Sequence, residues 1–99
     1  MNHKIPSREN CAKHDWGSYL FSYTTAINYE WFYNNKHGLR DKFAEYFALL
    51  AREFKGEDAV IGFELLNEPS FTWSIYIYPG LTDLHYLQPF YDAVADRIH

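Results

Sequence analysis

Two glutamates and an asparagine stand inside and just after an apolar run, in the stretch GFELLNEPSF over residues 62–71. An unpaired carboxylate costs several kcal/mol to desolvate, so Glu64 and Glu68 must have partners or lie where the protein does chemistry. A glutamate beside an asparagine at the end of a strand can exchange a proton with a substrate. Pro69 ends any ladder of hydrogen bonds and biases Glu68 towards an extended backbone.

The elements around these residues are those of an α/β protein. The run over 59–66 is apolar, contains valine and isoleucine, and is typical of a strand buried on both faces. A helix is predicted over 39–54, because Leu39, Phe43, Phe47, Leu50 and Phe54 fall on one stripe. A last helix over 88–98 has Pro89 in its first turn. The order helix, buried strand, long loop, helix indicates a parallel sheet.

The sequence predicts only one strand in 99 residues, whereas a parallel sheet needs several. We therefore expect a single incomplete domain over 1–99. Its parts are an irregular, aromatic loop over 1–25, a helical region over 26–54, a strand over 59–68, a cleft loop over 69–84 and a helix over 88–98.

Composition excludes several classes of protein. The net charge is −4 and no basic cluster occurs, so nucleic acid is not an expected partner. The histidines have no metal-ligand spacing, and no phosphate-binding loop or serine elbow occurs, so neither a metal nor another cofactor is predicted. No apolar stretch is long enough to span a membrane, and the polar start is not a secretory signal. The aromatic content of 20% offers flat platforms for sugars or lipids, with Trp16 and Trp73 as candidates.

The segment VIGFELLNEP over 60–69 resembles the acid/base signature of glycoside hydrolase family 5, a family of retaining (β/α)8-barrel glycosidases. The context over 34–69 and 78–99 looks like the endoglycoceramidase branch of that family. The resemblance implies part of a TIM (β/α)8 barrel, around helix 3, strand 4 and helix 4, rather than a complete barrel. It also implies a secreted, endomembrane or lysosomal location, which nothing in the residues themselves decides.

The resemblance assigns roles to two residues. Glu68 matches the general acid/base, which protonates the departing oxygen and then activates water, and Asn67 matches the residue that binds the sugar 2-hydroxyl. The family's nucleophile, a second glutamate near the seventh strand, has no match in this chain. Glu64 lies two residues deeper, about 6–7 Å along a strand, and is expected in the barrel interior.

The resemblance implies cleavage of the bond between glycan and ceramide in a glycosphingolipid, without a cofactor, by a longer protein to which this chain supplies the acid/base. Transient contact of that protein with a membrane surface is consistent with such a substrate. A different family 5 specificity, such as a β-glucosidase, a steryl glucosidase or an endoglucanase, is the first alternative. A non-catalytic truncated remnant is the second. Alone, the 99 residues are expected to be inactive, because retention needs two carboxyls about 5–5.5 Å apart.

Overall fold

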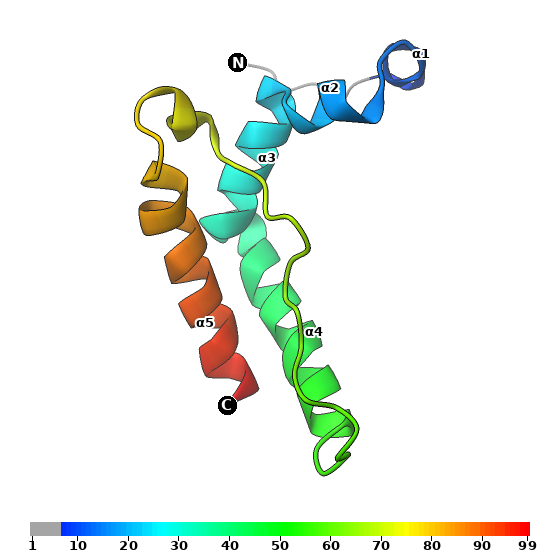
Figure 1. Cartoon of the computed structure of the whole chain (residues 1–99), viewed down its shortest axis with the longest axis vertical. Helices are drawn as coiled ribbons and strands as arrows, with labels where there is room; N and C mark the ends of the chain where they lie inside the picture. The colour runs from blue at the N-terminus through cyan, green and yellow to red at the C-terminus, as the bar shows by residue number, and fades with distance from the viewer. Residues whose placement is uncertain (1–6) are drawn as a thin grey trace.

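The structure, a computed structural model, describes residues 7–99 except for the side chain of Tyr76. Figure 1 shows a long helix with a second helix beside it, and an extended segment that returns along the long helix. Five α-helices are found in the described residues: α1 (Arg8–Ala12), α2 (Trp16–Leu20), α3 (Tyr23–Tyr33), α4 (Leu39–Glu53) and α5 (Gln88–Ile98). Shorter turns are η1 (Lys36–Gly38), η2 (Trp73–Tyr76) and η3 (Thr82–Leu87), the last of which runs into α5.

The first part of the chain is more regular than the irregular loop expected over 1–25, of which residues 1–6 lie outside the described part. Polar side chains start three helices here. Ser7, Asp15 and Ser22 each accept a hydrogen bond from a backbone N–H three residues later, at 3.1, 2.7 and 3.2 Å. Such caps satisfy amides that the first helical turn leaves free, which explains how α1 and α2, of five residues each, form without a hydrophobic stripe that would predict them.

The core lies between α3, α4 and α5. Tyr33 and Phe90 are 2% and 0% exposed, and their ring centroids are 5.3 Å apart. Val94 from α5, with Ala44 and Phe47 from α4, completes the buried centre. The helix over 39–54 predicted from its apolar stripe is present as α4, but the stripe is covered only in the middle, because Leu39 and Phe54 at its ends are each 45% exposed.

The segment over 57–72 follows α4 back towards α3 without forming a strand (Figure 1). Its Phe63, Leu65 and Leu66 pack against the core, whereas Ile61 is fully exposed. A strand needs a neighbour that completes its ladder of hydrogen bonds, and within residues 7–99 this segment has none. The strand over 59–68, and the partial barrel around it, therefore stay predictions about a longer protein.

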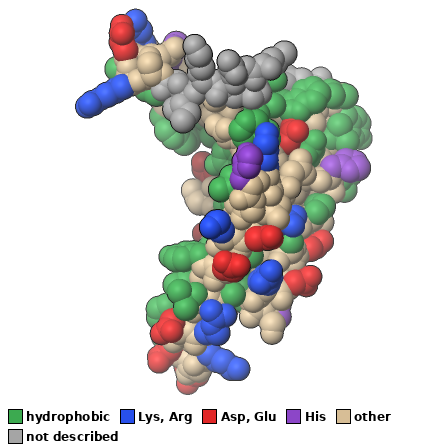
Figure 2. Space-filling model, turned by 180° about the vertical axis from the view of Figure 1, so that it is seen from behind, with side chains coloured by type: hydrophobic (Ala, Val, Ile, Leu, Met, Phe, Trp, Pro, Cys, Tyr) green, Lys and Arg blue, Asp and Glu red, His purple; other side chains and the backbone are tan. Residues whose placement is uncertain are grey.

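The chain exposes more surface than a compact protein of its size. Its accessible area is 7569 Å², whereas a folded monomer of 11.8 kDa exposes about 5,900 Å². Its radius of gyration is 15.9 Å, compared with about 13 Å for a compact domain of this length. Figure 2 shows hydrophobic side chains at several places on one face, and the exposed apolar residues include Trp16, Ile77 and Leu84. The helices alone thus leave much apolar surface uncovered.

Candidate functional site

Asn67 and Glu68 lie on the surface at a bend in the returning segment. Both side chains are exposed, and so is Pro69. Glu68 has a φ of +45°, in the left-handed region that residues other than glycine seldom occupy. The extended backbone expected for Glu68 from Pro69 is therefore wrong. Left-handed backbone costs of the order of 1–3 kcal/mol and persists only where the surroundings impose it.

Hydrogen bonds immediately after the bend supply that constraint. The hydroxyl of Tyr33, in α3, donates to the backbone carbonyl of Ser70 at 2.8 Å. The backbone N–H of Thr72 donates to Oγ1 of Thr82 at 3.2 Å, and the Thr72 hydroxyl lies 2.5 Å from that of Ser74. All these groups are buried. Ser70 and Thr72 are thus held at defined places, and the bend at Glu68 leads the chain to them.

Glu64 differs from its expected place in a barrel interior, because its side chain is exposed here. Its neighbours Phe63 and Leu65 are half-buried and face the core, so Glu64 points away from it. Between residues 7 and 99, no β-strand encloses the other face of the segment. The interior position of Glu64 therefore remains a prediction about a closed barrel.

The two tryptophans proposed as sugar or lipid platforms are both exposed. Trp16 is the first residue of α2 and is 71% exposed; Trp73 opens η2 and is 37% exposed. Within the described part of the chain, no hydrogen bond, ion pair or ring contact joins either of them to Asn67 or Glu68. Asn67 and Glu68 are close only because they are consecutive in the sequence. The two tryptophans are separate surface features.

A further carboxyl, that of Glu30, lies partly buried beside the aromatic core, and the sequence pattern did not single it out. Glu30 is in α3, one turn before Tyr33, and its Oε2 is buried without a hydrogen-bond partner. Burial raises the pKa of the Glu30 carboxyl above its ordinary value of 4.5. Burial also raises the pKa of the Tyr86 hydroxyl, with a further contribution from the charge of Glu30. The sequence offered one sign of this site: Glu30 is a charged residue among apolar and aromatic neighbours in the predicted helical region over 26–54.

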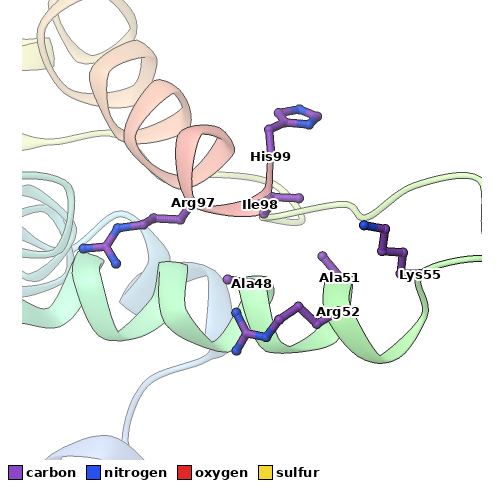
Figure 3. Close-up of a pocket in the computed structure, with 7 residues that line it drawn as sticks. All are labelled: Ala48, Ala51, Arg52, Lys55, Arg97, Ile98 and His99. Carbon is purple, nitrogen blue, oxygen red and sulfur yellow. The ribbon is translucent and has the colours of Figure 1, made fainter.

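A hollow of about 460 Å³ lies between the C-terminal ends of α4 and α5 (Figure 3). Arg52, Lys55 and Arg97 line it with His99, over a floor that includes Ala48 and Ala51. In residues 7–99, none of the three cations forms an ion pair. The hollow is at the opposite end of α4 from the contact between Tyr33 and Ser70, so it is not part of the surface that carries Glu68.

Two further properties concern metals and membranes. In the described residues, no three His, Cys, Asp or Glu side chains come close enough to hold a metal ion. No helix among them has the length and apolar character needed to cross a membrane.

The chain is similar to proteins named endoglycoceramidase from two animals. It is 42% identical over 98 residues to a protein of Cyanea nozakii and 39% identical over 97 residues to one of Hydra vulgaris. Each alignment takes in 94% of this chain, which spans 19% of the length of each relative. No family model matches the chain, and no solved structure matches it. Because each alignment leaves only about 6% of this chain uncovered, the stretch around Asn67 and Glu68 lies inside both. The similarity extends to about one fifth of each longer protein.

Proposed function

We propose that the chain is part of a retaining glycoside hydrolase, that Glu68 is its general acid/base, and that its substrate is a glycosphingolipid cleaved between glycan and ceramide. The observation that carries the proposal is the similarity to two proteins named endoglycoceramidase across nearly the whole chain. The exposed carboxyl of Glu68, at a bend that buried hydrogen bonds impose, supports it.

In the proposed reaction, a carboxylate from outside this chain attacks the anomeric carbon as the bond to the ceramide oxygen breaks. Glu68 gives its proton to that oxygen. Water then attacks the glycosyl-enzyme, Glu68 takes a proton from the water, and the nucleophile leaves as a carboxylate. Asn67 binds the sugar 2-hydroxyl, a contact that strengthens as the ring approaches the oxocarbenium-like transition state.

We also propose that the segment over 59–68 becomes a strand when neighbouring strands flank it, as the fourth strand of a (β/α)8 barrel. The proposal rests on its extended course, its apolar residues and the absence of a ladder partner between residues 7 and 99. The C-terminal ends of barrel strands carry catalytic groups, and Glu68 stands at that end of the segment.

A hybrid protein provides the test. In it, this chain replaces the matching stretch of the Cyanea nozakii relative, so that the rest of the longer protein is supplied. We expect the hybrid to hydrolyse glycosphingolipid and to lose that activity on the change Glu68→Gln. Full activity of the Glu68→Gln hybrid would overturn the role of Glu68.

The substrate class is tested separately, on the whole reading frame that encodes this chain. A frame that encodes a second strand-end glutamate downstream supports the enzyme, and its absence supports a remnant. Cleavage of glycosphingolipid in preference to steryl glucosides and cello-oligosaccharides supports the proposed substrate; the reverse preference supports another family 5 specificity.

Glu30 gives a prediction about stability rather than activity. Because its pKa is raised in the folded state, the unfolded chain ionises first as pH rises above about 4.5, and folding stability falls across that range. Glu30→Gln removes this penalty. The Glu30→Gln hybrid should therefore be more resistant to urea than the parent at pH 7 but not at pH 4. Chemical denaturation at both pH values measures this, and an equal difference at both would contradict it.

A further inference from the structure

The hydroxyl of Tyr33 makes a buried bond to the chain two residues beyond Glu68. It donates to the carbonyl of Ser70 at 2.8 Å, across 37 residues of sequence. Tyr33 is 2% exposed and Ser70 is 5% exposed, so water does not compete for either group. A buried hydrogen bond of this kind is costly to break, because the carbonyl left behind has no other donor.

The ring of Tyr33 has little freedom to move. Phe90 lies against it at 5.3 Å between centroids, Tyr29 at 5.7 Å and Phe32 at 5.9 Å. Burial raises the pKa of the Tyr33 hydroxyl, which stays protonated and remains a donor. The hydroxyl is thus held in place by the buried aromatic core.

The link from Ser70 to Glu68 is short and stiff. Only Pro69 stands between them, and its ring fixes φ near −65°. Thr72 is held in turn by Thr82, with 3.1 Å between their hydroxyl oxygens, so the chain beyond Ser70 cannot slide. Glu68 itself is exposed and makes no hydrogen bond within the described residues. The place of the Glu68 backbone, from which its carboxyl projects, therefore follows from where Ser70 is held.

We propose that Tyr33 is a positioning residue for the proposed acid/base: its hydroxyl holds Ser70 and thereby fixes the bend that presents Glu68. The inference rests on the proposed function of Glu68. It assigns to α3, which is far from Glu68 in sequence, a role in the reaction that involves no contact with the substrate. A displacement of about 1 Å in a catalytic group can cost up to 100-fold in rate, which is the scale of effect expected.

The test uses the hybrid defined above with Tyr33→Phe, which removes one oxygen and keeps the ring. We expect kcat for glycosphingolipid to fall 10- to 100-fold, with KM changed less than about threefold, because the buried Tyr33 hydroxyl is not itself a binding group and the Asn67 contact strengthens mainly in the transition state. Tyr29→Phe is the matched control: it is the same change one turn earlier in α3, where the hydroxyl makes no hydrogen bond in the described structure. The control should keep kcat within twofold.

A second background separates positioning from general damage. In this background the hybrid carries Glu68→Gln, the substrate is an activated aryl glycoside and azide is the added nucleophile. Turnover then uses neither the acid nor the base. Adding Tyr33→Phe to that background should change turnover by less than twofold. An equal loss in both backgrounds would show a purely structural role and overturn the inference.

The outcomes distinguish the inference from the function on which it rests. If Glu68→Gln leaves activity intact, the proposed function fails; if Glu68→Gln abolishes activity while Tyr33→Phe does not reduce kcat, only the positioning role fails. Should Tyr33→Phe unfold the hybrid at the assay temperature, Thr72→Val loosens the same stretch from the η3 side. The same selective loss of kcat is then expected, and its absence would overturn the inference.

Discussion

The change Glu68→Gln in the hybrid is expected to lower kcat for glycosphingolipid by 10²- to 10⁴-fold, the usual contribution of a positioned general acid or base. Glutamine keeps the size of the side chain and cannot give or take the proton. The loss should be largest for ceramide, because an alkoxide leaves poorly without protonation. Steady-state assays with the glycolipid measure it.

The same variant should behave differently with an activated aryl glycoside. Its leaving group needs no proton, so the glycosyl-enzyme still forms, and only its hydrolysis is slow for want of a base. Azide, which attacks without losing a proton, should restore turnover and give a glycosyl azide of retained configuration. Glu57→Gln, the same change at an exposed site at the start of the returning segment and outside the predicted strand, is the control and should act within twofold of the parent. Equal losses for both variants would contradict the assignment.

The second large effect concerns the 99 residues made alone, for which we expect no glycosidase turnover and no cooperative, monomeric unfolding transition. The chain exposes 7569 Å², well above the area of a compact protein of its mass, and an extended apolar segment lies on its surface without a ladder partner in the described part. Unpaired extended segments with exposed Val60 and Ile61 tend to associate.

Calorimetry and sedimentation of the purified 99-residue chain test this expectation, and the hybrid provides the folded control. A sharp thermal transition from a monomer would contradict it. Turnover that Glu68→Gln abolishes in the isolated chain would contradict the statement that the nucleophile comes from elsewhere.

Local sequence patterns were enough to predict the packed helices α4 and α5, but they did not predict the bend at Glu68. The stripe of Phe43, Phe47 and Leu50 predicts a helix over 39–54, and the structure has α4 at Leu39–Glu53. Pro89 near the start of the helix over 88–98 likewise agrees with α5 at Gln88–Ile98. These features depend on neighbours within a few positions, which a sequence displays directly.

The surroundings of Glu68 depend on distant residues instead. The rule that a residue before proline is extended expresses a local steric preference, which distant contacts can override. Glu68 has φ +45°, and Ser70 and Thr72 just beyond it are bonded to Tyr33 and Thr82. No periodicity joins positions 33 and 70. The identity of Asn67 and Glu68 as candidates came from the resemblance, and the geometry that presents them came only with the fold.

The bond between Tyr33 and Ser70 closes a loop that contains the whole of α4, and this makes insertions and deletions unequal along it. The fifteen residues of α4 rise about 22 Å, whereas the fourteen residues over 57–70 could span up to about 46 Å if fully extended. The two turns over 54–60, closed by bonds from the Glu57 N–H to the Phe54 carbonyl and from the Val60 N–H to the Glu57 carbonyl, therefore hold slack, and a residue gained or lost there leaves the bend in place. A residue gained or lost between 63 and 69 reverses which side chains face inward, so natural variation in chain length should collect in those turns and avoid the stretch before Ser70.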